Sequence, residues 1–171
     1  AIGKAREIAE ITEKAMNGDI DFETALKNRV KLLAGLNINQ LIEFVLEKLL
    51  ITQGANTLVK TMKANGATTA LVSGGFTVIT EIIREKLNFD LCYGNTLSVD
   101  SSILTGNLKP PIIDGDAKAA ILDQECEKLE ISKNDTLAVG DGANDIPMLT
   151  NAGLGVGFRP KPVVKNYASN I

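Results

Sequence analysis

The sequence contains no histidine among its 171 residues and only two cysteines, Cys92 and Cys126. Without histidine, a serine–histidine catalytic triad is excluded, and acid–base chemistry must use carboxylates, lysine, tyrosine or water. Two cysteines form neither a disulfide framework nor a zinc-binding pattern.

Long apolar runs are lacking as well. No segment is long enough to span a bilayer, and the least charged region, residues 64–80, is interrupted by glycines and threonines. The net charge of −3 argues against a nucleic-acid or membrane partner. No secretory n-region or h-region opens the sequence, so we expect a cytoplasmic protein. An initial methionine is missing too, and the first residues read as the interior of a helix, so we expect part of a longer gene product.

Apolar residues recur only at helical spacing up to about residue 50, which predicts a small all-helical subdomain over residues 1–50. Its predicted helices run over residues 2–16, over residues 22–33 and through residues 41–49. Gly18 and Gly35 are expected to end the first two, and Asp21 to cap the second at its N-terminus.

Strands and helices alternate over residues 51–171. This alternation predicts an α/β fold in which helices flank a parallel sheet. The predicted helices cover residues 54–65, 76–87 and 115–129, with a short one after residue 145. The predicted strands cover residues 67–72, 136–139 and 153–158, and a hairpin of residues 91–99 and 103–105 turns at Asp100–Ser101.

The stretch "ALVSGGFT" predicts an anion site. Ser73 is expected at the carboxyl end of a strand, with Gly74 and Gly75 opening the next helix. A hydroxyl and bare backbone N–H groups would then meet at a positive helix end. A plain strand-to-helix turn capped by serine explains the same residues equally well.

Lys118 falls in the first turn of a predicted helix, where a cation is unfavourable by about 0.3–1 kcal/mol. A bound anion would explain it. Neutralisation by the nearby Asp114 and Asp116 is a second explanation, and the residues alone slightly favour that one.

"GDGANDIPM" follows an apolar strand, at the edge where ligands bind in open parallel sheets. Asp141 and its polar neighbours offer hard oxygen ligands that suit Mg²⁺. A turn rich in side-chain caps, in which Asp145 begins a helix before Pro147, is the alternative. The density of polar groups favours the metal.

Arg29 lies seven residues after Phe22, on a face with Leu26 and Val30. A guanidinium on an apolar stripe predicts a carboxylate or phosphate partner. An arginine at the edge of the stripe that reaches water is the more common arrangement.

"SGGF", Lys118 and "GDGANDIPM" resemble, in this order, the second, third and fourth motifs of the haloacid dehalogenase (HAD) superfamily. "AMNGDIDFETALKNRVKLLAGL" resembles the helical cap of the phosphoserine phosphatases within it, as do "ILTGNL" and "RPKPVVKNYA". The resemblance covers essentially the whole chain. P-type ATPases share GDGxND but need membrane helices. The resemblance implies a Rossmann-type core with a helical cap, and Mg²⁺-dependent hydrolysis of O-phosphoserine through a phosphoaspartyl intermediate, the last step of serine synthesis.

The resemblance also implies roles for particular residues. Ser73 and Gly74 would hold phosphate oxygens, Lys118 would offset the phosphoryl charge, and Asp141 would ligate Mg²⁺. Asn144 would touch the phosphate, and Asp145 would orient Lys118 or a metal-bound water. In the cap, Arg29 would pair with the substrate carboxylate, with Met16 and Phe22 walling the pocket.

The first motif of the superfamily, D-x-D-x-T after an apolar strand, does not occur in the sequence. The nucleophile and the general acid are therefore absent, and we expect the 171 residues alone to be inactive. Asp19–Asp21 follows a helix end, and the resemblance aligns Asp114–Asp116 with the loop just before the family's lysine, so neither pair replaces the motif. The resemblance also places a further strand beyond Ile171. Loss of a central strand would leave a buried sheet edge, which favours a longer gene product over a true truncation.

Three functions stay open from the sequence. They are a phosphoserine phosphatase, a HAD phosphatase for another small phosphoester, and a truncated non-catalytic chain that binds Mg²⁺ or phosphate. The oligomeric state is open too, a homodimer included.

Overall fold

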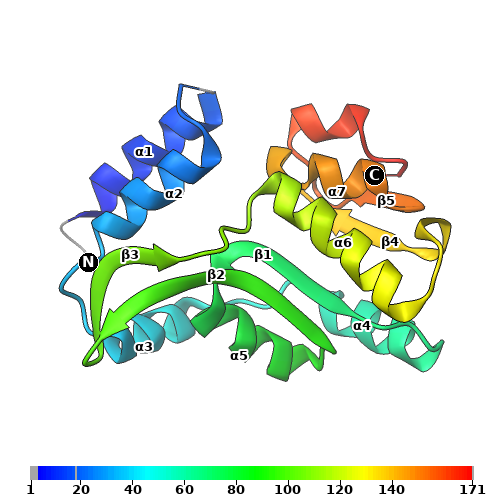
Figure 1. Cartoon of the computed structure of the whole chain (residues 1–171), viewed down its shortest axis with the longest axis horizontal. Coiled ribbons are helices and arrows are strands. Elements are labelled where there is room, and N and C mark those ends of the chain that lie inside the picture. Colours follow the sequence, from blue (N-terminus) through cyan, green and yellow to red (C-terminus); the bar gives the residue numbers. More distant parts are fainter. Residues whose placement is uncertain (1–3, 18, 171) are drawn as a thin grey trace. The chain divides into compact units, whose positions relative to one another are not determined.

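The computed structural model describes residues 4–17 and 19–170, and the chain divides into two compact units, residues 1–112 and 113–171 (Figure 1). Helices and strands occur in both units, and both contain parallel strand pairs. The predicted α/β class is confirmed. No helix within the described residues is both long and apolar enough to cross a membrane.

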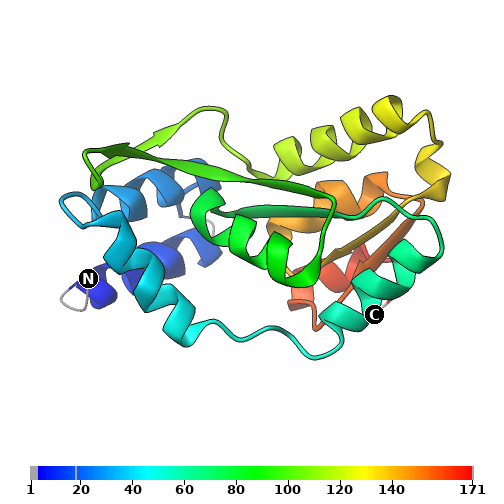
Figure 2. The same ribbon diagram turned by 90° about the horizontal axis from the view of Figure 1, so that it is seen from below.

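The first unit holds a three-stranded sheet in the order β1-β2-β3, with β1 and β2 parallel and β3 antiparallel to β2 (Figure 2). Its strands are β1 (Ala70–Phe76), β2 (Leu91–Asp100) and β3 (Ile103–Lys109), and its helices are α1 (Ala5–Asn17), α2 (Phe22–Lys31), α3 (Ile38–Lys48), α4 (Ala55–Ala64) and α5 (Thr77–Leu87). Helix α5 packs against β1 and β2.

Side-chain caps define where the early helices begin. Asp21 caps α2 by accepting a hydrogen bond from Thr24 N at 2.9 Å, and Asn37 caps α3 by accepting one from Asn39 N at 2.9 Å. Gly35, with φ +82°, supplies the left-handed residue that turns the chain after α2. These local signals explain why α2 was predicted correctly.

Helix α2 buries its apolar stripe against the β2–β3 hairpin. Leu26 and Val30 of α2 form a core cluster with Leu97 and Leu104 of the hairpin. Each such buried side chain contributes about 1.5–3 kcal/mol relative to exposure. The backbone joins them as well, because Leu104 exchanges hydrogen bonds with the residues after α2: Gly35 N donates to Leu104 O at 2.9 Å and Leu104 N to Leu36 O at 2.8 Å. The predicted subdomain boundary near residue 50 falls inside this unit and stays a prediction.

Strand β1 differs from its prediction. It runs to Phe76, and α5 begins only at Thr77, so the expectation that Gly74 and Gly75 open the helix is wrong. The β1–β2 ladder pairs Val72 with Tyr93 and then Phe76 with Asn95. The extra residues form a bulge that contains both glycines, and strand pairing resumes after them at Phe76.

The β2–β3 turn lies one residue later than predicted. Ser101 and Ser102 both adopt the left-handed conformation, with φ of 48° and 67°. This is the geometry of a two-residue hairpin turn, which matches the twist of the flanking strands.

The second unit holds the parallel pair β4 (Leu137–Gly140) and β5 (Leu154–Gly157), with helices α6 (Gly115–Leu129) and α7 (Ile146–Asn151). Three short 3₁₀ helices complete it: η2 (Lys133–Asp135), η3 (Ala143–Asp145) and η4 (Pro162–Asn166). Its core consists of Ala138, Met148, Leu149 and Val164. A Cβ on Gly155 would lie 2.3 Å from Leu149 O, so only glycine lets α7 approach β5 this closely.

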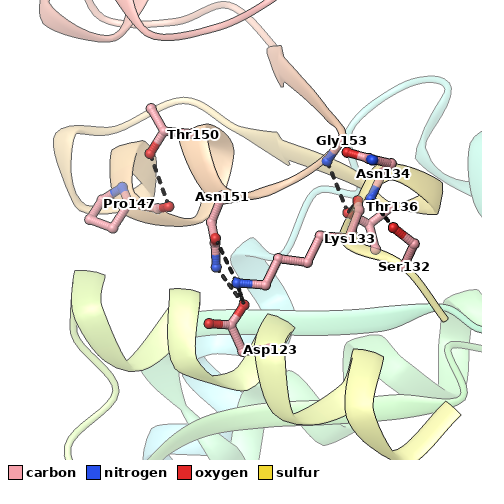
Figure 3. Close-up of polar contacts among 9 residues, drawn as sticks. All are labelled: Asp123, Ser132, Lys133, Asn134, Thr136, Pro147, Thr150, Asn151 and Gly153. Carbon is pink, nitrogen blue, oxygen red and sulfur yellow. Dashed lines mark hydrogen bonds and ion pairs between the residues drawn. The ribbon is translucent and has the colours of Figure 1, made fainter. Parts of the chain in front are cut away.

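A polar cluster ties α6 to α7 (Figure 3). Asp123 Oδ1 of α6 accepts from Lys133 Nζ at 2.7 Å and from Asn151 Nδ2 of α7 at 2.5 Å. Lys133 Nζ also donates to Asn151 Oδ1 at 3.0 Å. Lys133 holds the pKa of Asp123 below its usual value. The three side chains therefore fix the two helices to each other at the end of α7.

Candidate functional site

The loop after β4 is organised by one buried carboxylate. Asp145 is 6% exposed, and its Oδ2 accepts from the backbone N–H groups of Asp141 and Gly142, each at 3.0 Å. These bonds curl the chain tightly as it leaves the strand. A Cβ on Gly140 would lie 2.5 Å from Asp145 Cβ, so glycine is required where the strand ends.

The other oxygen of Asp145 holds Lys118. Lys118 Nζ lies 2.6 Å from Asp145 Oδ1, and both side chains are almost fully buried. The two residues are 27 positions apart in the chain, on α6 and next to α7. Among the described residues, neither Asp114 nor Asp116 forms an ion pair with Lys118. Asp114 instead caps α6 by accepting from Ala117 N at 2.8 Å. The structure therefore places a buried ammonium beside the acidic loop.

Asp141 lies at the carboxyl end of β4 and is exposed. Within the described residues, no hydrogen bond or ion pair holds its side chain, so both oxygens are open to a ligand. No group of three or more histidine, cysteine, aspartate or glutamate side chains in residues 4–17 and 19–170 is arranged to hold a metal. Asp141 therefore offers a free carboxylate, and one such ligand fits Mg²⁺, which keeps several waters and needs only one or two protein carboxylates.

Asn144 lies between Asp141 and Asp145 and is half-buried. A Cβ on Gly142 would lie 2.7 Å from Asn144 Oδ1, and one on Gly115 would lie 3.1 Å from Asn144 O. The two glycines thus let Asn144 sit against both the loop and the start of α6.

In the first unit, the bulge of β1 contains Ser73 and Gly74. Ser73 Oγ accepts from Gly75 N at 3.0 Å, and Gly74 O accepts from Asn95 Nδ2 of β2 at 3.0 Å. Asn95 is completely buried. The sequence alone did not predict this residue. The available signal was a polar side chain on the strand face that also bears Tyr93 and Leu97.

Arg29 is half-buried on α2, and its Nε donates to Ala25 O one turn earlier at 3.3 Å. No acidic side chain pairs with it within the part of the chain that the structure describes. Burial lowers the pKa of the Arg29 guanidinium below its usual value. Phe22, on the same helix, packs at the edge of the core cluster formed with the hairpin.

The candidate residues thus form two groups. Arg29, Phe22, Ser73 and Gly74 belong to the first unit, and Lys118, Asp141, Asn144 and Asp145 to the second. The side chain of Met16, at the end of α1, lies outside what the structure describes.

Residues 2–150 match the family model of the haloacid dehalogenase-like hydrolases. The chain belongs to this family. The resemblance inferred from the motifs is therefore confirmed.

Relatives within the HAD family carry a narrower description. A probable phosphoserine phosphatase of Schizosaccharomyces pombe is 43% identical over 170 residues, which cover 98% of this chain and 57% of that protein. A phosphoserine phosphatase of Lactococcus lactis subsp. lactis is 42% identical over 167 residues, covering 98% of this chain and 77% of that one. A solved substrate-bound phosphoserine phosphatase complex is 39% identical with a TM-score of 0.91, covering 99% of this chain and 80% of that chain.

This chain covers only part of the length of several curated relatives. It spans 57%, 48% and 39% of three curated relatives, about half their length.

Proposed function

We propose that the protein is a phosphoserine phosphatase that hydrolyses O-phosphoserine to serine and phosphate. In this proposal it acts in the cytoplasm, at the last step of serine synthesis, on a small phosphorylated amino acid. The observation that carries the proposal is the buried pair of Lys118 and Asp145 beside the loop after β4.

Lys118 is suited to offset phosphoryl charge. Its ammonium carries three hydrogens, and Asp145 Oδ1 takes one of them. The others remain for phosphate oxygens and for the attacking carboxylate. Because Lys118 is removed from water, solvent would screen its charge little, and phosphoryl transfer depends mainly on electrostatic stabilisation of this kind.

Asp141 would hold Mg²⁺. A magnesium ion keeps several waters and needs only one or two protein carboxylates, so a single free carboxylate at the end of β4 is enough from this unit. When bound, the ion would neutralise charge on the phosphoryl group. Asp145 contributes indirectly, because it fixes the backbone of Asp141.

Substrate recognition would come from the first unit. Ser73 and Gly74 would bind phosphate oxygens. Arg29 would pair with the carboxylate of phosphoserine, since within the described residues its half-buried guanidinium has only a carbonyl of its own helix as a partner. Phe22, on the same face of α2, and Met16 would wall the pocket.

The covalent step needs an aspartate nucleophile. Its oxygen would attack phosphorus, the bond from phosphorus to the seryl oxygen would break, and a second acid would protonate that oxygen. Water would then release phosphate from the acyl phosphate. The 171 residues contain no D-x-D-x-T motif to supply this pair, so we expect them alone not to turn over substrate.

The test is phosphate release by purified protein, in a form that includes a D-x-D-x-T motif if the gene encodes one. With Mg²⁺, phosphoserine should be hydrolysed faster than an aryl phosphate, and chelation should stop the reaction. Lys118→Met should lower kcat by about 10²-fold or more, while Lys128→Met, an exposed lysine of the same helix, should not. Equal rates on both substrates would remove the assignment to phosphoserine and leave a HAD phosphatase of another substrate. Absence of turnover would favour a non-catalytic binder.

A further inference from the structure

The bulge of β1 leaves backbone groups outside the sheet ladder. Between the pairs Val72–Tyr93 and Phe76–Asn95, residues 73–75 oppose the single residue Gly94. The peptide groups of this bulge need partners other than the ladder. Two hydrogen bonds that involve side chains lie in this bulge, and together they bear on the orientation of the Ser73 hydroxyl.

Both bonds use the same peptide group. Asn95 Nδ2 donates to Gly74 O at 3.0 Å, and Gly75 N donates to Ser73 Oγ at 3.0 Å. The carbonyl of Gly74 and the N–H of Gly75 lie in one plane and point in opposite directions. By holding the carbonyl inward, Asn95 directs the N–H toward Ser73.

The hydroxyl of Ser73 is thereby prepared as a donor. A serine hydroxyl has one hydrogen and two acceptor lone pairs, and the Gly75 N–H occupies one lone pair. Within the described residues, nothing accepts the hydroxyl hydrogen of Ser73. A hydroxyl that already accepts a hydrogen bond also donates more strongly. This hydrogen is available for a phosphate oxygen.

The surroundings of Asn95 make the arrangement rigid. Asn95 has no exposed surface, so its amide cannot exchange Gly74 O for bulk water. A Cβ on the neighbouring Gly94 would lie 3.0 Å from Thr80 Oγ1 and 3.2 Å from Gly75 O. Glycine at this position lets β2 lie close enough to the bulge for Asn95 to reach it.

We propose that Asn95 is a positioning residue for phosphate binding, which acts by setting the peptide plane that orients the Ser73 hydroxyl. The inference rests on the proposed function for the identity of the ligand. The orientation of the loop by Asn95 does not depend on the substrate, so it can be tested without one.

The first experiment is a double-mutant cycle on phosphoserine hydrolysis, made in a form of the protein that includes a D-x-D-x-T motif. Asn95→Leu removes the donor at similar size and should lower kcat/KM by about tenfold, and Ser73→Ala should lower it by about 10–100-fold. In the Ser73→Ala background, Asn95→Leu should cost less than about twofold, because the hydroxyl that it orients is gone. Equal costs in both backgrounds would show that Asn95 does not act through Ser73 and would overturn the proposal.

Stability has its own control. Val59→Ala removes buried volume from α4 in the same unit and should leave kcat/KM within about twofold. If Val59→Ala lowers kcat/KM as much as Asn95→Leu does at a matched loss of melting temperature, the effect of Asn95 is structural and the proposal fails. Should Asn95→Leu not fold, Asn95→Ala takes its place in the cycle.

The second experiment needs no substrate. Amide hydrogen exchange at Gly75, measured by NMR well below the melting temperature, should accelerate by about tenfold in the Asn95 variant and not in Val59→Ala. Unchanged exchange at Gly75 would overturn the inference. If the parent protein, in a form that includes a D-x-D-x-T motif, does not hydrolyse phosphoserine, the proposed function fails, and the exchange at Gly75 still decides whether Asn95 fixes this loop.

Discussion

The buried pair of Lys118 and Asp145 is expected to be the most costly polar contact to break in the second unit. The side chains are 6% and 9% exposed, and their charged atoms lie 2.6 Å apart. Replacing Lys118 by methionine keeps most of the side-chain length but leaves a buried carboxylate without its cation. Breaking a buried pair in this way costs about 3–5 kcal/mol.

Asp145→Ala is expected to cost more than Lys118→Met. It strands the ammonium and also removes the acceptor of two backbone N–H groups, those of Asp141 and Gly142. Each buried donor without a partner adds about 1–3 kcal/mol. Lys118→Met leaves those two bonds in place, so it should lower the free energy of unfolding less than Asp145→Ala does.

Urea denaturation followed by circular dichroism measures these losses. The matched control is Glu23→Gln, which breaks an ion pair with Lys27. In this pair the lysine side chain is 55% exposed and the glutamate side chain 46%. Such an exposed pair contributes about 0–1 kcal/mol. If Lys118→Met loses no more stability than Glu23→Gln, or if Asp145→Ala loses less than Lys118→Met, the account of this pair is wrong.

Three further outcomes are expected. Gly140→Ala should destabilise the protein by about 1–3 kcal/mol in the same urea assay, since its Cβ would meet Asp145, and a neutral result would contradict the packing there. The hydrogen bond from Lys63 is the largest cause that lowers the pKa of Asp90 to about 2. The contribution of the Asp90 carboxylate to folding stability is therefore present above pH about 4 and is lost as the pH falls toward 2. Because this carboxylate is one-third exposed, the loss should be only about 1 kcal/mol and absent in Asp90→Asn. Arg29→Ala should raise KM for phosphoserine by about tenfold or more and hardly affect an aryl phosphate, whereas equal effects on both would make Arg29 structural.

Local signals allowed most helices to be predicted. The boundaries of α6 match the prediction because Asp114 caps it, and Glu130 ends it in the left-handed conformation. The predicted start of α5 is one residue early, and the prediction that Gly74 and Gly75 open this helix is wrong. That boundary depends on where β1 stops pairing with β2, which is a contact between distant segments.

The site residues also differ in whether local sequence could predict their contacts. Residues alone slightly favoured Asp114 and Asp116 as partners of Lys118, because they are its neighbours in sequence. The actual partner, Asp145, emerged from the family resemblance and not from spacing. Asn95 was missed because its contact with Gly74 O depends on the bulge of β1, a distant segment, although its place on the strand face of Tyr93 and Leu97 was a signal of burial.

The shared carboxylate of Asp145 has a consequence for how this protein can vary. One oxygen holds Lys118 and the other holds the backbone of Asp141 and Gly142, so the positions of the lysine and of the loop both depend on one side chain. In a saturation screen, position 145 should therefore tolerate no substitution, not even glutamate, whose extra methylene displaces both contacts together. A change there disables the lysine and the loop in a single step, and no second substitution at only one of them can restore the other.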